Sequence, residues 1–302
     1  MKLVSFVRGG GPAPHFGALL GEEVLDFTTA LSTAPPPAAR PDFIAWFDME
    51  GQLFQKARDL FETLRTNPEI GAAMRSKALL PRREVTLRAP VPRPGKVICI
   101  GRNYRDHAAE GGVEIPERPL IFSKFATSII GPGETVRIPP GSEKVDYEAE
   151  LAVVIGARAR NVSADRALDF VLGYANFNDV SARDFQFGDG QWQRGKSCDT
   201  FAPIGPYIAT TDEIPSPHEL RIRLRLNGDT MQDSNTDQMI FGVPQLIAAI
   251  TESVTLEPGD VIATGTPHGV GFARKPPVWL KPGDELEVEI EGLGVLRNTM
   301  GS

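Results

Sequence analysis

The stretch of sequence that decides the fold is Asp146-Tyr147-Glu148-Ala149-Glu150-Leu151-Ala152-Val153-Val154-Ile155. Its second half is a continuous apolar run, which predicts a buried β-strand. Side chains alternate between the two faces of a strand, so Glu148 and Glu150 point to the same side. Neighbouring carboxylates repel each other unless a proton or a cation lies between them. On an exposed strand the pair would form a solvated charged face; the buried run beside it weakens that interpretation, and a metal site is the alternative.

A third carboxylate is available from Asn178-Asp179-Val180-Ser181-Ala182-Arg183-Asp184. Asp179 follows an apolar run, and the alternative role for such a residue is to cap the N-terminus of a helix. Three carboxylates without a nearby Cys or His suit a hard cation, Mg²⁺ or Mn²⁺, with positions open for water or substrate. The four histidines lack the paired spacing of zinc ligands, so zinc is disfavoured.

Candidate acid–base residues lie in Gly101-Arg102-Asn103-Tyr104-Arg105-Asp106-His107-Ala108-Ala109-Glu110. If this segment turns into a helix, His107 and Glu110 are three residues apart and can touch. A carboxylate that orients a histidine is a common general-base arrangement, although a histidine at a helix start is often merely exposed or capping. Lys124 and Lys196 are candidates to hold a substrate carboxylate, with surface lysines as the alternative. His268, in a turn, is assigned a structural or rim position.

The 302 residues leave room for one large domain and one small one. The 26 prolines and 30 glycines separate short apolar runs, which predicts many short strands joined by turns. Residues 1–85 are predicted to form a small domain of a β-meander and a helix over Asp42–Arg65. Residues 95–302, after a proline-rich connector, are predicted to form a strand-rich domain with helices at Ala164–Val171 and Val243–Ile250.

Charge and composition exclude several classes of protein. The formal net charge of −7 argues against a nucleic-acid partner. No run of eighteen apolar residues occurs, so no membrane-spanning segment is expected. The N-terminal residues lack a signal-peptide pattern, and two cysteines predict a reducing compartment, the cytoplasm. A Gly-x-Ser-x-Gly nucleophile motif and a phosphate-binding loop are absent from the sequence.

Six segments, taken in order, resemble the fumarylacetoacetate hydrolase family over residues 95–298. They are Gly101-Arg102-Asn103-Tyr104 with His107 and Glu110, Pro119-Leu120-Ile121-Phe122-Ser123-Lys124, Asp146-Tyr147-Glu148-Ala149-Glu150-Leu151, Asn178-Asp179-Val180-Ser181-Ala182-Arg183-Asp184, Gly195-Lys196-Ser197 and Thr264-Gly265-Thr266-Pro267. The N-terminal part resembles the small β-rich extension of many bacterial members. One departure is Ile100, which stands where the animal hydrolases carry a further metal-binding Asp.

The resemblance implies an α+β, strand-rich fold: a mixed β-roll or sandwich catalytic domain with a small N-terminal α/β domain, usually as a homodimer. It implies Mg²⁺ or Mn²⁺, with Ca²⁺ as a substitute, held by Glu148, Glu150 and Asp179. It implies that His107 and Glu110 activate water and that Lys196 stabilises the carbanion. The implied substrate contacts are Arg102, Tyr104, Lys124, Arg183, Gln186 and Thr266.

The function expected first is hydrolysis of a C–C bond in an acylpyruvate-type 2-oxo acid, through a metal-stabilised enolate. The same enolate serves isomerisation of hydroxydienoates and decarboxylation of oxaloacetate, which are the alternatives on the same site. A hypothesis from another class is a non-catalytic sensor of a small anionic oxo acid. The His107–Glu110 pair argues against it, because a sensor needs no water-activating base. A lid over the site is expected between Gly111 and Arg118.

Overall fold

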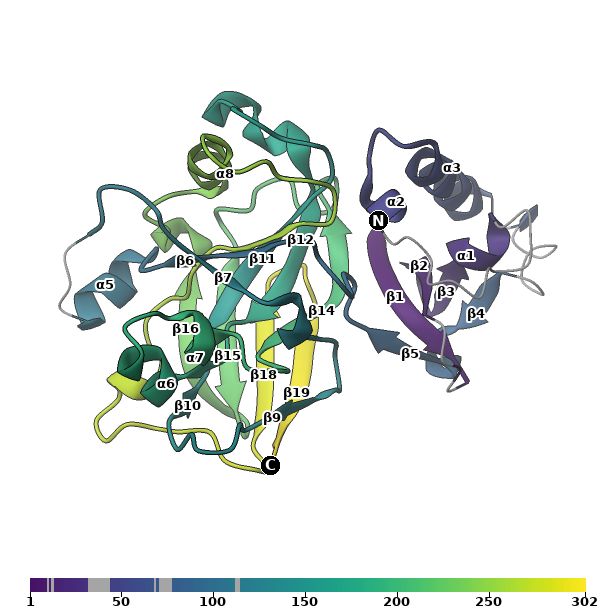
Figure 1. Cartoon of the computed structure of the whole chain (residues 1–302). Coiled ribbons are helices and arrows are strands. Elements are labelled where there is room, and N and C mark those ends of the chain that lie inside the picture. Colours follow the sequence, from purple (N-terminus) through teal and green to yellow (C-terminus); the bar gives the residue numbers. More distant parts are fainter. Residues whose placement is uncertain (10, 12–13, 32–43, 68, 71–77, 112–114) are drawn as a thin grey trace.

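The computed structural model describes residues 1–302 except 10, 12–13, 32–43, 68, 71–77 and 112–114. The chain has the expected strand-rich α+β fold, in which a large mixed sheet packs against a smaller one (Figure 1). Residues 112–114 of the expected lid lie outside the described residues.

The N-terminal part is a meander covered by helices, at one side of the molecule (Figure 1). Its strands are β1 (Lys2–Arg8), β2 (His15–Leu20), β3 (Glu23–Asp26), β4 (Leu79–Pro81) and β5 (Val85–Arg88). Its helices are α1 (Phe27–Ala30), α2 (Ile44–Phe47), α3 (Gln52–Thr66) and the short 3-10 helix η1 (Arg82–Glu84).

The helix expected over residues 42–65 is two helices, α2 and α3. Gly51, with extended dihedral angles, is the N-cap of α3, and the Met49 N–H donates to the Gly156 carbonyl at 2.8 Å. The chain therefore leaves the helical path between them to contact the larger part. The expected apolar stripe of α3 is buried at Phe54, Phe61 and Leu64.

The N-terminal strands continue the large sheet, because β1 pairs antiparallel with β14 (Ala202–Thr210). The pairs are Lys2 with Ala209 and Leu3 with Ile208. The sheet runs in the order β4-β3-β2-β1-β14-β12-β11-β17-β6-β7. The division into two domains stays a prediction, and both parts contribute strands to this sheet.

The centre of the large sheet is β11 (Ala149–Ile155), the strand expected from the apolar run, and all of its residues are buried. Around it lie β12 (Val171–Asn178), β17 (Val261–Ala263), β6 (Val97–Gly101) and β7 (Leu120–Lys124). β11 pairs antiparallel with β12 and β17. Apolar side chains on both faces explain the continuous pattern, since both faces of the sheet are covered.

The smaller sheet covers one face of the large one and shares its hydrophobic core. Its strands are β16 (Asp229–Asn235), β15 (Arg221–Leu226), β18 (Glu285–Ile290), β19 (Val295–Gly301) and β9 (Thr135–Arg137), in that order. β15 alternates buried and more exposed residues, as a strand with one solvated face should. The strands expected near residues 220–226 and 285–291 are confirmed.

The remaining elements are short. They are α5 (Arg105–Gly111), η2 (Ala126–Ser128), β8 (Ile129–Ile130), β10 (Val145–Asp146), η3 (Ala164–Phe170), β13 (Ser181–Ala182), α6 (Arg183–Gly188), α7 (Gln193–Lys196), η4 (Thr236–Gln238), α8 (Val243–Thr251) and η5 (Gly271–Ala273). The helix expected at 243–250 is α8, whereas that at 164–171 is the 3-10 helix η3, which ends where β12 begins. No helix within the described ranges is long and apolar enough to cross a membrane.

Candidate active site

Three buried carboxylates meet at one end of β11. One oxygen from each of Glu148, Glu150 and Asp179 lies within 4.8 Å of the others. The antiparallel pairing of β11 with β12 causes this, because Ala149 stands opposite Asn178 and Asp179 leaves β12 beside Glu148. The Asp179 N–H donates to the Glu148 carbonyl at 2.9 Å. Asp179 does not cap a helix, since the N-cap of the following α6 is Ala182.

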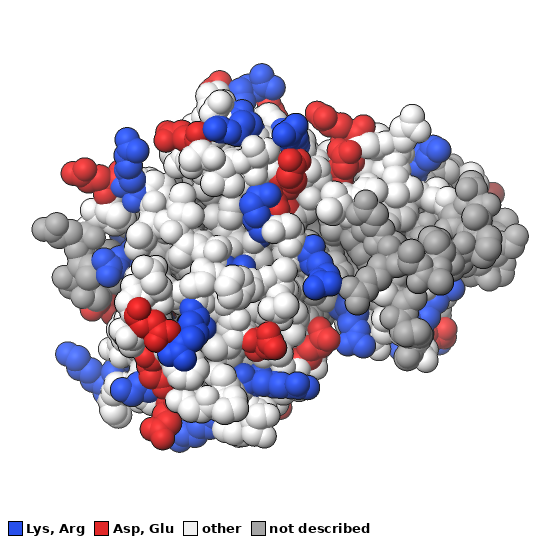
Figure 2. Space-filling model, in the orientation of Figure 1, with Lys and Arg blue, Asp and Glu red and all other residues white. Residues whose placement is uncertain are grey.

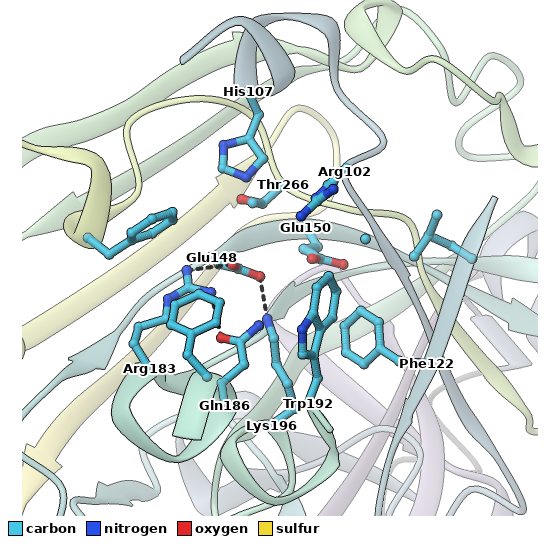
Figure 3. A pocket seen from close by; sticks show the side chains of 14 residues that line it. Arg102, His107, Phe122, Glu148, Glu150, Arg183, Gln186, Trp192, Lys196 and Thr266 are labelled. Atoms are coloured by element: carbon cyan, nitrogen blue, oxygen red, sulfur yellow. Dashed lines mark hydrogen bonds and ion pairs between the residues drawn. The ribbon is translucent and has the colours of Figure 1, made fainter. Parts of the chain in front are cut away.

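Cationic side chains surround two of these carboxylates. Lys196 Nζ donates to Glu148 at 2.7 Å and to Asp179 at 2.9 Å. Lys124 Nζ donates to the other oxygen of Asp179, and Arg183 Nη2 donates to Glu148 at 2.6 Å. Lys124 and Lys196 are only 3% and 2% exposed, so neither is a surface lysine. The dashed contacts in Figure 3 show Glu148 between Arg183 and Lys196.

Glu150 has a different environment. Its carboxylate accepts from the Gly265 backbone N–H at 2.9 Å. Burial, together with the negative charges of Asp179 and Glu148, raises its pKa well above the ordinary 4.5. For Glu148, burial also acts to raise the pKa, but Lys196 and Arg183 outweigh it and lower the pKa to about 2.

A divalent cation fits this donor set. Three carboxylate oxygens converge within reach of one ion, and one carboxylate is buried against like charge without a cationic hydrogen-bond partner among its described contacts. Oxygen-only ligands suit Mg²⁺, Mn²⁺ or Ca²⁺. The triad can therefore hold a divalent metal, whose identity the donor set does not fix.

Two members of the triad, Glu148 and Glu150, form part of the wall of a cavity of about 290 Å³. The lining residues are Ile100, Gly101, Arg102, His107, Phe122, Glu148, Glu150, Arg183, Gln186, Phe187, Trp192, Lys196, Thr266 and Phe272. In Figure 3 Glu148 lies with Arg183 and Lys196 on one side of the cavity, His107 and Arg102 point in from the opposite side, and Trp192 and Phe122 form a third wall. An anionic group and an apolar or planar group can be bound together here.

His107 reaches the cavity from α5 and touches Glu110, as the spacing predicted. The distance from His107 Nδ1 to Glu110 Oε2 is 3.3 Å. Glu110 also accepts from the Gly269 N–H at 3.0 and 3.2 Å. Burial would raise the pKa of Glu110, but His107 and the Gly269 N–H together lower it below its ordinary value. An ionised Glu110 can orient the imidazole and stabilise its protonated form.

The other expected substrate contacts divide into two groups. Arg102, Arg183, Gln186 and Thr266 line the cavity. The Thr266 hydroxyl donates to the Ala149 carbonyl at 2.8 Å and accepts from Gln232 at 2.9 Å, so it is held in place. The other two expected contacts, Tyr104 and Lys124, lie outside the cavity wall.

Tyr104 and Lys124 are not among the residues that line the cavity. Tyr104 is fully buried and forms a β-bridge with Met239. Lys124 lies behind Asp179, where it donates to that carboxylate and, at 3.0 Å, to the Val180 carbonyl. Their geometry fits support of the site rather than direct contact with a substrate.

Sequence reasoning missed the aromatic wall and the partner of Arg183. Phe122, Trp192, Phe187 and Phe272 line the cavity, but isolated aromatics are ordinarily read as core residues. Asp146 accepts from Arg183 Nε at 2.9 Å and Nη2 at 2.7 Å. The position of Asp146 two residues before Glu148 was the available signal.

Comparisons with known proteins agree with this fold. The family model described as fumarylacetoacetate (FAA) hydrolase, C-terminal, matches residues 96–301. The mitochondrial oxaloacetate tautomerase FAHD2A of Bos taurus is 53% identical over 222 residues, covering 73% of this chain and 71% of the relative. The mitochondrial oxaloacetate tautomerase fahd2 of Xenopus laevis is 43% identical over 302 residues, covering 99% and 89%.

A solved structure is also similar over the whole chain. The crystal structure of 2-hydroxyhepta-2,4-diene-1,7-dioate isomerase from Mycobacterium marinum is 32% identical, with a TM-score of 0.73, covering 100% of this chain and 98% of that one. These three relatives are enzymes by name, and this protein is an enzyme of the same kind of fold. The chain belongs to the fumarylacetoacetate hydrolase family.

Proposed function

We propose that the protein catalyses keto–enol proton transfer on a small 2-oxo dicarboxylic acid, with oxaloacetate as the first candidate. The observation that carries this proposal is the position of the His107 imidazole, which faces Glu148 and Glu150 of the triad across one cavity while Glu110 holds its Nδ1. A proton acceptor on one side and a concentration of charge on the other is what enolisation of a 2-oxo acid requires.

The charge balance supports a dianionic substrate. The buried charged residues around the triad are Asp146, Glu148, Glu150, Asp179, Lys124, Arg183 and Lys196. With all of them ionised, this group carries one net negative charge, which a divalent cation would convert to one net positive charge. A group of side chains with one net positive charge can bind one substrate carboxylate. Arg102 lines the cavity on the opposite side and is available for a second carboxylate (Figure 3).

A divalent cation held by the three carboxylates would supply the positive charge that stabilises an enolate. The protein's own residues do the rest. His107, oriented by Glu110, takes the proton from the enol oxygen and delivers it to the adjacent substrate carbon, and the reverse transfer forms the enol from the keto acid. Lys196 and Arg183 keep Glu148 ionised and in place. The aromatic wall of Phe122 and Trp192 excludes water beside the reacting carbon.

Hydrolysis of an acylpyruvate-type C–C bond is the second candidate, because a His–Glu pair also activates water. The names of the relatives favour proton transfer: oxaloacetate tautomerases and a hydroxyheptadienedioate isomerase. Decarboxylation of oxaloacetate uses the same enolate and is tested in the same experiment.

The experiment measures metal-stripped protein with and without Mg²⁺ or Mn²⁺ against enol-oxaloacetate, a hydroxydienoate and acetylpyruvate. We expect metal-restored decay of the enol absorbance, above the spontaneous rate, with no CO₂ released. Release of CO₂ would point to decarboxylation, and pyruvate formed from acetylpyruvate would point to hydrolysis. Saturable binding without turnover of any substrate would favour the sensor.

Partners and compartment are also proposed rather than observed. We propose a homodimer, to be tested by light scattering, and no nucleic-acid partner. On the face shown in Figure 2 the basic and acidic side chains of the described residues are interspersed, without a continuous basic patch among them. The predicted cytoplasm and the mitochondrial location named for the relatives are both reducing, which suits two free thiols at Cys99 and Cys198. Fluorescence microscopy of a tagged chain would distinguish them.

A further inference from the structure

Asp106, outside the cavity, ties the start of α5 to two distant parts of the chain. Its Oδ1 accepts from the His107 backbone N–H at 2.7 Å, and its Oδ2 accepts from the Ser234 hydroxyl of β16 at 2.6 Å. His268 contributes its ring Nδ1 at 2.9 Å and its backbone N–H at 3.4 Å. Because an ionised carboxylate only accepts, Nδ1 of His268 carries the proton in this contact.

Glu110 binds the next residue of the same segment. The Gly269 N–H donates to both oxygens of Glu110 at 3.0 and 3.2 Å. Asp106 and Glu110 are four residues apart and so lie on one side of α5. The two carboxylates therefore accept hydrogen bonds from the adjacent residues His268 and Gly269. The Glu110 carboxylate also contacts the His107 imidazole.

The position of α5 depends on such contacts. The helix has seven residues, and a helix that short has little stability of its own in water. The segment that it contacts, His268 and Gly269, begins two residues after Thr266, which lines the cavity. The place of His107 over the cavity is therefore set by how α5 is fastened to this segment.

We propose that Asp106 is a positioning residue, whose contacts with His268 and Ser234 hold α5 so that His107 reaches the substrate. This inference rests on the proposed role of His107. Asp106 does not line the cavity, so it acts through His107 rather than on the substrate. Ser234 and His268 are positioning residues for the same reason, because they donate hydrogen bonds to Asp106.

The primary test is Asp106→Asn. The amide nitrogen cannot accept from Ser234 or His268, while the size of the side chain is kept. We expect kcat to fall about 10- to 100-fold, as for a displaced catalytic group. We expect KM and the Mg²⁺ affinity to stay within about twofold, because Asp106 contacts neither the triad nor the arginines that line the cavity. Amide hydrogen exchange of residues 105–111 should quicken.

Asp237→Asn is the matched control. Asp237 also lies beside α5, where its backbone carbonyl meets Arg105, but its carboxylate accepts from Gln238 at 2.9 Å. This variant removes the same charge without touching the contact with His268. We expect wild-type kcat and wild-type exchange of α5.

A pair of variants at His268 tests the hydrogen bond itself. Asparagine carries an N–H close to the position of the imidazole Nδ1, whereas alanine carries none. We expect His268→Ala to lower kcat as Asp106→Asn does, and His268→Asn to restore most of it. Equal activity of the two variants would contradict the role of the Nδ1 contact.

A double-mutant cycle separates this proposal from the proposed function. If His107→Ala keeps wild-type turnover, the proposed function fails, whatever Asp106→Asn does. If His107→Ala is impaired and Asp106→Asn keeps both wild-type kcat and wild-type exchange, the positioning proposal is overturned. If Asp106→Asn lowers residual turnover equally in the wild-type and His107→Ala backgrounds, Asp106 does not act through His107, and the proposal is again overturned.

Discussion

Glu148 and Glu150 stand side by side, yet replacing each with Gln should change stability in opposite directions when no metal is bound. Glu150 is buried against the charges of Asp179 and Glu148. At the 4.8 Å limit of their ligand oxygens, each repulsive pair costs about 3 kcal/mol at an effective dielectric constant of about 20. Because Glu150 can take up a proton, the free-energy cost of this repulsion cannot exceed the cost of protonating the carboxylate. To neutralise a carboxyl of ordinary pKa 4.5 at pH 7 costs about 3 kcal/mol.

Glu150→Gln should therefore stabilise the metal-free protein by up to about 3 kcal/mol at pH 7. The raised pKa means that the folded wild type binds more protons than the unfolded chain. Metal-free wild type consequently loses stability as pH rises above 4.5, and the variant should not. The Gly265 N–H keeps an acceptor, because the Gln oxygen can replace the carboxylate.

Glu148→Gln should instead destabilise the metal-free protein. The pKa of Glu148 is lowered to about 2, so this carboxylate contributes stability above pH 4.5 that is lost as pH falls toward 2. Without its charge, Lys196 and Arg183 are left with less compensation, and the loss should be about 3 kcal/mol at pH 7.

The assay is urea unfolding with EDTA and with excess Mg²⁺, for wild type and both variants. With EDTA we expect the order Glu150→Gln, wild type, Glu148→Gln, from most to least stable. With Mg²⁺ wild type should become the most stable, because only it keeps all three ligands. If both variants change the free energy of unfolding in the same direction with EDTA, the electrostatic difference between the two glutamates is refuted.

Three further outcomes follow from the same site. His107→Ala should lower kcat about 10²- to 10⁴-fold in steady-state assays, with Mg²⁺ affinity by calorimetry unchanged, because the imidazole is no metal ligand here. Arg102→Met should raise KM about tenfold for a dicarboxylate, since a charge-assisted contact is lost, but not for a 2-oxo monocarboxylate. Gly265→Ala should destabilise the protein by about 1–3 kcal/mol in urea unfolding, because Gly265 has φ +99° and the new Cβ would lie 2.8 Å from Asn103 Cβ.

The features that the sequence predicted well are local ones. The apolar run of β11 fixed both the central strand and the common direction of Glu148 and Glu150, since strand alternation depends only on neighbouring residues. The His107–Glu110 contact followed from helical spacing. Asp179 was offered as a third carboxylate with helix capping as the alternative, and only the family resemblance implied that it is a metal ligand, because only the β11–β12 pairing brings it there.

The features that were missed depend on contacts distant in sequence. The pairing of β1 with β14 joins residues about two hundred positions apart, and no local pattern of Lys2 or Leu3 indicates it. The same holds for the aromatic wall, where Phe122 packs edge-on against Trp192 with ring centroids 5.4 Å apart. An aromatic residue gives the same sequence signal in a cavity wall as in a core.

Alternation of charge through the site explains why the triad can stay assembled with or without a metal. The hydrogen-bonded chain runs Asp146, Arg183, Glu148, Lys196, Asp179, Lys124, with each acid between or beside cations. Glu150 stands outside this chain and accepts from a backbone N–H instead. The paired carboxylates therefore keep their positions without a metal, whereas Glu150 gains most from its arrival. It follows that metal affinity should respond more steeply to pH through Glu150 than through Glu148, since the pKa of Glu150 is raised well above 4.5 and that of Glu148 is lowered to about 2.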